Sequence, residues 1–187
     1  MESAVRREII LSGAGGQGLI LAGAILAEAA GVYENREVVQ TQSYGIQARG
    51  GASQSTVIIS DDRIKFPEVL APDILLCLSP EACARYTPAL REGGLLIVDQ
   101  DLVSVEALGD GATLVALPFT AAAEKMGHRI AANVIALGAL AMVTGVVNPE
   151  SIGKAIPSRL PDRNVNVALE ALEIGVTLAA TVEARAR

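Results

Sequence analysis

The stretch LSGAGGQGLILAG, Leu11 to Gly23, constrains the fold of this chain more than any other segment. A short apolar run ends at Gly13 in a glycine-rich loop, and an apolar stretch with helical character begins at Leu19. A fully apolar strand of this kind suits a parallel sheet that is covered on both faces. Strand, glycine loop and helix in this order predict an α/β domain whose first loop lies at the carboxyl edge of the sheet.

The rest of the chain alternates in the same way between apolar strands and helices. We expect strands at 7–13, 36–40, 53–60, 73–79, 95–99 and 112–118, with a polar loop at 41–51 and a brief antiparallel return at 63–66. We expect helices at 19–30, ended by Gly31, and at 80–86, 129–143, 150–155 and from 162 to the end. The prediction is one domain, 1–187, of Rossmann-like α/β class, with a mostly parallel sheet and helices on both faces.

The charge and the hydropathy of the chain narrow its possible partners. With 15 basic and 21 acidic residues, and no basic block or aromatic ladder, we expect no nucleic-acid binding. Hydrophobic residues make up 51% of the chain, and the mean hydropathy is +0.41. Two explanations stay open: a surface hidden against other subunits, or an aliphatic-rich core.

Cysteine and histidine are too few for a metal centre. Cys77 and Cys83 cannot by themselves hold a four-cysteine iron–sulfur cluster or a tetrahedral zinc ion. Cys77 is expected in the core, Cys83 is expected to be partly exposed in a first helical turn, and His128 is expected to close a turn. We predict no metal site and no catalytic residue, because no convincing general base or nucleophile is present.

Two uncharged stretches imitate membrane signals. The run after Arg7 resembles a secretory signal, but Gln17 and several glycines interrupt it. Residues 130–147 reach the length of a transmembrane candidate, yet they are rich in small and polar residues. A helix buried between protein layers explains them better. With the sparse cysteines, this predicts a cytoplasmic protein without a membrane segment.

The glycine loop has two interpretations. Gly13, Gly15 and Gly18 match G-x-G-x-x-G between a strand and a helix, and such glycines let backbone N–H groups approach a diphosphate. The acidic residue that should bind a ribose at the end of the second strand is missing, since Gln40 and Gln42 stand there. NAD or FAD binding and tight packing of the first helix therefore both stay open.

Gly16 and Gln17 complete this candidate cofactor-binding loop. The side-chain amide of Gln17 can both donate and accept hydrogen bonds. It can therefore reach either a ligand or a neighbouring backbone group, and both options stay open.

The stretch SYGIQARGG, 43–51, follows the second strand and is expected at the same edge of the sheet. The guanidinium of Arg49 suits a carboxylate or a phosphate, and Tyr44 offers a ring face and a hydroxyl. Alternatively, Arg49 forms an ion pair and Tyr44 covers the core. The candidate cofactor-binding residues of this stretch are Tyr44, Gly45, Arg49, Gly50 and Gly51.

Three stretches in this order and spacing resemble the gamma subunit of 2-oxoacid:ferredoxin oxidoreductases: GAGGQG at 13–18, YGIQARGG at 44–51 and NVIALG at 133–138. The likeness covers nearly the whole chain. One departure is Ile46–Gln47, where the family often has Pro and an acidic residue, so this loop is less rigid and less acidic.

The resemblance implies an enzyme that oxidatively decarboxylates a 2-oxoacid, transfers the acyl group to coenzyme A and reduces ferredoxin. It places thiamine diphosphate with Mg in the partner alpha and beta chains, and the iron–sulfur clusters in the beta chain or in a ferredoxin-like delta chain. Coenzyme A is the co-substrate, and no cofactor is bound by this chain alone.

The resemblance also adds Asn133 to the candidate cofactor-binding set, where it orients a loop, accepts an interface bond or simply packs. Residues 37–55 are nearest to the 2-oxoglutarate type, while pyruvate, branched-chain and aryl oxoacids stay open. The alternatives are a free-standing NAD- or FAD-binding oxidoreductase and a non-catalytic scaffold subunit.

Overall fold

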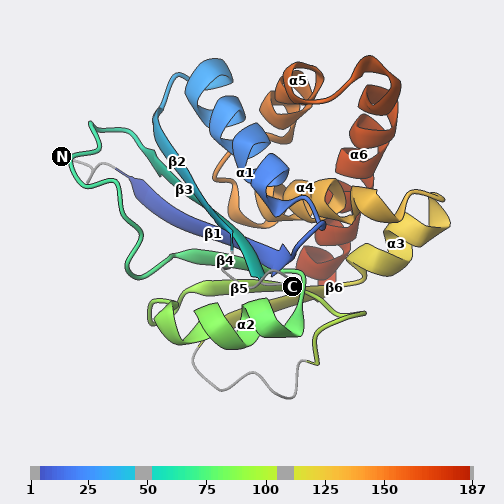
Figure 1. Cartoon of the computed structure of the whole chain (residues 1–187), viewed down its shortest axis with the longest axis horizontal. Coiled ribbons are helices and arrows are strands. Elements are labelled where there is room, and N and C mark those ends of the chain that lie inside the picture. Colours follow the sequence, from blue (N-terminus) through green and yellow to red (C-terminus); the bar gives the residue numbers. More distant parts are fainter. Residues whose placement is uncertain (1–4, 45–51, 105–111, 186–187) are drawn as a thin grey trace.

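The computed structural model describes residues 5–44, 52–104 and 112–185. They form a six-stranded sheet in the order β2-β3-β1-β4-β5-β6, with helices on both faces (Figure 1). The strands are β1 Arg6–Ala14, β2 Glu37–Tyr44, β3 Ala52–Ser60, β4 Ile74–Cys77, β5 Leu95–Asp99 and β6 Thr113–Leu117. The predicted Rossmann-like α/β class is confirmed, and the sheet is mixed.

β3 is the strand that breaks the parallel order. β1, β4, β5 and β6 pair in parallel, whereas β3 runs antiparallel to both β1 and β2. The predicted antiparallel return at 63–66 is wrong, because this segment is an irregular loop. Instead of the hydrogen bonds of a strand pair, a side-chain contact fixes this loop: Arg6 Nη2 donates a hydrogen bond to the carbonyl of Phe66 at 3.0 Å.

The second strand extends further than its apolar residues predicted. β2 continues through 41–44, a segment we expected to be loop, and pairs residue for residue with β3. Polar cross-strand contacts support this half of the hairpin: the hydroxyls of Thr41 and Thr56 lie 2.5 Å apart. A hairpin at the edge of a sheet does not need alternating apolar residues, so the hydrophobic pattern of the sequence did not predict this part of β2.

The helices are α1 Leu19–Glu28, α2 Pro80–Tyr86, α3 Phe119–Lys125, α4 Ala132–Thr144, α5 Pro149–Arg159 and α6 Asp162–Arg185, with a π-helical turn η1 Ala29–Tyr33 and 3₁₀ turns η2 Thr87–Ala89 and η4 Arg129–Ala131. Gly31 does not end the first helix as predicted, because the π-helical turn η1 extends the helical conformation to Tyr33. α5 likewise passes its expected end at 155 through the exposed Pro157, and α3 was not predicted.

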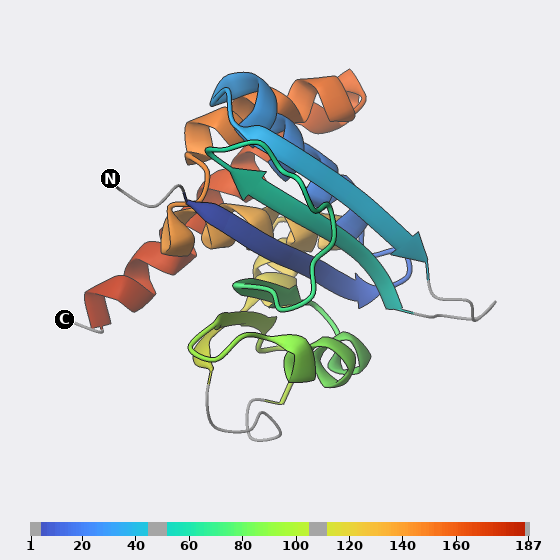
Figure 2. The same cartoon turned by 90° about the vertical axis from the view of Figure 1, so that its left-hand side faces the viewer.

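Two apolar clusters lie on opposite faces of the sheet. α1, α4, α5 and α6 cover one face and α2 covers the other (Figures 1 and 2). Side chains alternate along β1, so Ile9 and Leu11 join the larger cluster and Ile10 the smaller one beneath α2. The core is therefore built on both sides of the sheet, as expected for an α/β domain.

Both cysteines are buried in the smaller cluster. Cys77 has no exposed surface, as predicted, but Cys83 is also buried, so its expected partial exposure is wrong. Cys83 lies on the inner side of α2, which packs on the sheet. The hydrogen bond with Cys83, together with burial, raises the pKa of Cys77.

α4 is enclosed between the sheet and α6. Every residue from Asn133 to Ala141 is buried, which confirms the predicted buried helix within 130–147. A Cβ on Gly175 would collide with the carbonyl of Ile135, and one on Gly138 with the carbonyl of Leu172. The two backbones therefore touch. Across the described ranges, no helix has both the length and the apolar character needed to span a membrane.

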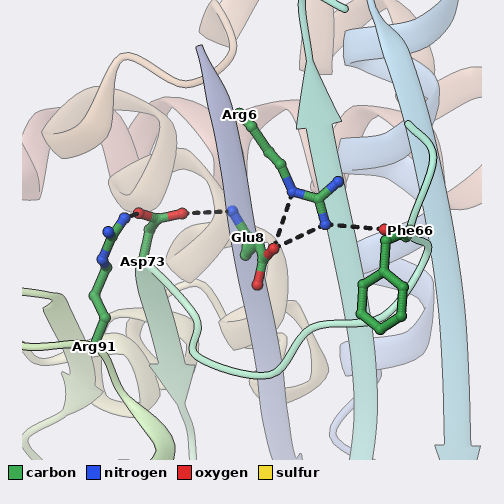
Figure 3. A network of polar contacts seen from close by, with 5 residues as sticks. All are labelled: Arg6, Glu8, Phe66, Asp73 and Arg91. Carbon is green, nitrogen blue, oxygen red and sulfur yellow. Dashed lines mark hydrogen bonds and ion pairs between the residues drawn. The ribbon is translucent and has the colours of Figure 1, made fainter. Parts of the chain in front are cut away.

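Charged side chains close the amino edge of the sheet, where β1 and β4 begin (Figure 3). The carboxylate of Asp73 accepts a hydrogen bond from the backbone N–H of Glu8 at 2.7 Å and forms an ion pair with Arg91. Arg6 binds the carboxylate of Glu8 at 2.8 Å. This group of residues is the amino-edge network.

Candidate functional site

The glycine loop joins the end of β1 to the start of α1 at the carboxyl edge. Gly16 and Gly18 adopt positive φ angles of 90° and 76°, which only glycine adopts without strain. Gly15 and Gly16 are exposed, and a Cβ on Gly16 would meet nothing within 4 Å. The middle of the loop is therefore open to a ligand or a partner chain.

Gln17 ties this loop to the neighbouring strand. Its Oε1 accepts a hydrogen bond from the backbone N–H of Ala14 at 2.6 Å, and its Nε2 donates to the carbonyl of Leu78 at 2.9 Å. Leu78 directly follows β4. A Cβ on Gly13 would collide with this Oε1, so Gly13 makes room for the Gln17 side chain. Of the two options for the amide, bonding to backbone groups is the one seen.

Asn133 fixes the other end of the loop. Its Nδ2 donates a hydrogen bond to the carbonyl of Gly18 at 3.0 Å, and its side chain is nearly fully buried. A Cβ on Gly18 would collide with this amide. Two of the three stretches that carry the family resemblance therefore meet in one contact, with Asn133 orienting the loop.

A hollow of about 340 Å³ opens beside the glycine loop at the carboxyl edge. Residues that follow β1, β4 and β5 line it together with the starts of α3 and α4: Gly16, Gln17, Leu78, Leu102, Thr120, Arg129, Ile130 and Ala132. The charged residue among them is Arg129, whose side chain is 72% exposed and lies 3.7 Å from Glu124. The sequence prediction did not include Arg129, although it stands four residues before Asn133.

Asp99 fixes the position of Thr120, one of the residues that line this hollow. This fully buried residue ends β5, and its Oδ2 accepts hydrogen bonds from the hydroxyl of Thr120 at 2.5 Å and the Thr120 N–H at 3.1 Å. Burial raises the pKa of Asp99, against the lowering effect of these hydrogen bonds. The sequence prediction missed this residue, because an Asp after an apolar strand also suits an ordinary turn.

A second hollow of about 200 Å³ lies between α1, α4 and the start of α6. Its walls include Leu21, Val134 and Val167, and it shares the 66% exposed side chain of Ile130 with the first hollow. His128 lies at the same place and closes a turn, as predicted, because its carbonyl accepts a hydrogen bond from Ala131 N–H at 2.8 Å.

The second candidate loop starts and ends at the same edge of the sheet. β2 ends at Tyr44, and β3 begins at Ala52, which pairs with Ala14 at the start of the glycine loop. The hydroxyl of Ser53 also donates to the carbonyl of Gly13 at 3.4 Å. The candidate residues Gly45, Arg49, Gly50 and Gly51, and the side chain of Tyr44, lie outside the described residues.

The sheet order explains why no acidic residue follows the second strand. In a dinucleotide-binding domain the second strand lies directly beside the first and carries the ribose-binding carboxylate. Here the antiparallel β3 separates β2 from β1. Gln40 uses its amide to donate a hydrogen bond to the hydroxyl of Ser55 at 3.0 Å. The place directly beside β1 is therefore taken by β3, the inner strand of the β2–β3 hairpin.

Within 5–44, 52–104 and 112–185, no three His, Cys, Asp or Glu side chains come together as a metal site would require. Fold and loop together define a Rossmann-like domain with its glycine loop held by its own side chains. The chain belongs to the pyruvate ferredoxin/flavodoxin oxidoreductase family, whose model matches residues 8–178.

Relatives and solved structures agree with this family. The chain is 52% identical over 159 residues to 2-oxoglutarate synthase subunit KorC of Methanocaldococcus jannaschii, covering 84% of this chain and 85% of that one. It is 42% identical over 177 residues to the same subunit of Methanothermobacter marburgensis, covering 91% and 95%. A crystal structure of the keto/oxoacid ferredoxin oxidoreductase gamma subunit from Geobacter sulfurreducens matches with a TM-score of 0.84 and 46% identity, covering 95% and 98%.

The fold also matches one part of a larger chain. The 2-oxoglutarate:ferredoxin oxidoreductase of Magnetococcus marinus, solved with 2-oxoglutarate, coenzyme A and succinyl-CoA bound, aligns with a TM-score of 0.81 at 20% identity. The alignment covers 94% of this chain and 31% of that one, and it shows the shared fold. The predicted resemblance to the gamma subunit is thus confirmed, and an oxidoreductase subunit is supported over a free-standing dinucleotide enzyme.

Proposed function

We propose that this chain is the gamma subunit of a 2-oxoglutarate:ferredoxin oxidoreductase, which converts 2-oxoglutarate and coenzyme A to succinyl-CoA and CO₂ with reduction of ferredoxin. The observation that carries the substrate assignment is the 52% identity to a 2-oxoglutarate synthase subunit over most of both chains. The polar segment 37–55, nearest to the 2-oxoglutarate type, also favours this oxoacid over pyruvate.

The groups that perform the oxidation belong to partner chains in this proposal. Thiamine diphosphate, bound with Mg by the alpha and beta subunits, supplies the carbanion chemistry. Iron–sulfur clusters in the beta or a ferredoxin-like delta subunit carry the electrons. The cysteines of this chain do not fit a cluster, because Cys77 and Cys83 are both buried in the smaller apolar cluster between α2 and the sheet. We place the complete enzyme in the cytoplasm.

The task of this chain is to hold an anion of the substrate or of coenzyme A. The first turn of α1 has N–H groups without partners inside the helix, and a helix N-terminus attracts negative charge. Gln17 and Asn133 hold the backbone of the glycine loop, so Gly15 and Gly16 can approach a diphosphate or a carboxylate. Arg49, and Arg129 at the rim of the larger hollow, supply the positive charge.

The identity of the complex and its substrate are tested together. The native complex is purified, its co-eluting subunits are identified, and its activity is measured with a panel of oxoacids and a viologen dye. We expect kcat/KM to be highest for 2-oxoglutarate. Highest activity with pyruvate or a branched-chain oxoacid would contradict the substrate assignment, and purification as a self-sufficient monomer with bound dinucleotide would contradict the subunit assignment.

The role of the loops is tested by single arginine variants of the complex. Arg49→Ala and Arg129→Ala are each expected to raise KM for coenzyme A or 2-oxoglutarate about tenfold, while the subunits still co-purify, because one charge-assisted hydrogen bond is worth about 1.4 kcal/mol or more. Arg91→Ala is the control matched to Arg129→Ala, since both arginines are exposed but Arg91 lies at the amino edge. Unchanged KM values in both carboxyl-edge variants would leave only a scaffold role.

A further inference from the structure

The outer edge of β2 is an open backbone edge. β2 is the last strand on its side of the sheet and pairs along its inner side with β3 (Figure 2). In an antiparallel pair, the N–H and C=O groups of every second residue point away from the partner strand. No other strand of the described ranges pairs with these outward groups. β2 therefore presents a row of backbone donors and acceptors.

The edge lacks the features that usually protect such strands. Exposed edges are commonly blocked by lysine, proline or a bulge. β2, with the sequence EVVQTQSY, contains neither lysine nor proline, and it pairs with β3 residue for residue without a bulge. Its single charged residue, Glu37, stands at its first position. Such an edge is suited to pairing with a further strand.

Two exposed apolar side chains lie shortly before the first residue of β2. Val32 is 69% exposed and Tyr33 is 42% exposed, both in the last part of η1. η1 lies against β2, because the Cβ position of Gly31 is 3.6 Å from the Val38 side chain. Large apolar side chains that gather on a surface mark an interface. The exposed apolar side chains therefore lie near the start of the strand whose outer backbone edge is open.

We propose that the outer edge of β2, with Val32 and Tyr33, binds an extended segment of a companion subunit as an added strand. This inference rests on the proposed function for the existence of a companion. The row of backbone groups selects an extended chain, and the two apolar side chains favour apolar residues on one face of that chain. A second copy of this chain is less suited, because two copies of net charge −6 repel each other.

Hydrogen exchange in the purified complex tests the added strand. Amide exchange is read at single residues from Val38 to Ser43 by mass spectrometry with fragmentation. If a strand is added, every amide in this range is protected by at least tenfold over its intrinsic rate. Without one, every second amide exchanges freely, and that alternation would overturn the proposal. The amides of the central strand β1 serve as the protected reference.

Cross-linking then identifies the occupant. A photo-reactive benzophenone side chain replaces Val32 in the complex, and the same group at the exposed Leu70 near the amino edge is the matched control. We expect position 32, and not position 70, to link to an extended segment of a companion subunit. A link to a second copy, or to residues 45–51 of the same chain, would overturn the proposal. A complex that contains companions and oxidises 2-oxoglutarate, but gives neither result, leaves the proposed function intact.

Discussion

The two edges of the sheet satisfy their polar groups in different ways. At the amino edge, charged side chains bind one another, as in the amino-edge network around Asp73 and Arg91. At the carboxyl edge, the amides of Gln17 and Asn133 bind backbone groups of the glycine loop, and a hollow of about 340 Å³ stays open beside Gly16. The first arrangement closes the sheet, whereas the second shapes a backbone for contact with another molecule.

We expect the largest effect from a substitution of Gly18 in the glycine loop at the carboxyl edge. Gly18→Val must adopt a φ of 76° and displace the amide of Asn133, so we expect a loss of about 3 kcal/mol in the free energy of unfolding. Urea unfolding of the purified protein measures this. Gly16→Ala is the matched control, because its φ is also positive but its Cβ would meet open space, and about 1 kcal/mol is expected. Equal losses in both variants would contradict the role of Asn133.

Removing the amide that holds the loop gives the next effect. Asn133→Ala leaves the carbonyl of Gly18 without this donor, and we expect a loss of about 2 kcal/mol with a higher KM for coenzyme A. Asn133→Asp keeps the size of the side chain but removes the donor, so it should weaken the protein similarly. Full stability in Asn133→Asp would show that the side chain acts by its volume and not by its hydrogen bond.

At the amino edge a smaller effect is expected, confined to stability. Asp73→Asn still offers an oxygen to the N–H of Glu8 but loses its charge toward Arg91. Because the arginine is largely exposed, we expect only a small drop in Tm, with unchanged KM values in the complex. A changed KM for coenzyme A would show that the two edges are not independent.

The smallest effect concerns the pH dependence of Asp99. Burial raises the pKa of Asp99 above its ordinary value of 3.8, so the folded protein holds this proton more tightly than the unfolded chain. The contribution of Asp99 to stability is therefore full below pH 3.8 and falls as the pH rises through the raised pKa. Relative to the native protein, Asp99→Asn should gain stability over this range in urea unfolding at a series of pH values. Parallel stability curves for the two proteins would contradict it.

The buried elements of the fold were predictable because their sequence signals are local. The apolar run of β5 and the Pro80 that opens α2 define those elements as the structure has them. The polar half of β2 was not predictable, because its stability comes from cross-strand contacts such as Thr41 with Thr56. α3 was missed for a similar reason, since its start is held by the distant Asp99.

The candidate site was predictable in its glycines and less so in its other residues. The glycine pattern identified Gly13 and Gly18, but it did not show that Gly13 makes room for Gln17 and Gly18 for Asn133. Asn133 is 115 positions away from Gly18, so only the fold brings the two together. Arg129 carries no local motif and joins the site only through the fold. The proposed ligand contacts of Arg49 remain a prediction, since this residue lies outside the described ranges.

The touching backbones of α4 and α6 have a consequence for engineering this protein. Because Gly138 and Gly175 leave no room for a side chain at the crossing, the two helices can neither slide nor rotate against each other without separating. A tag or fusion that pulls on the end of α6 transmits its load through this crossing to α4, whose first turn carries Asn133. A tag or fusion partner at the carboxyl terminus therefore needs a flexible linker. Without it, the load would disturb the glycine loop that Asn133 holds, far from the point of attachment.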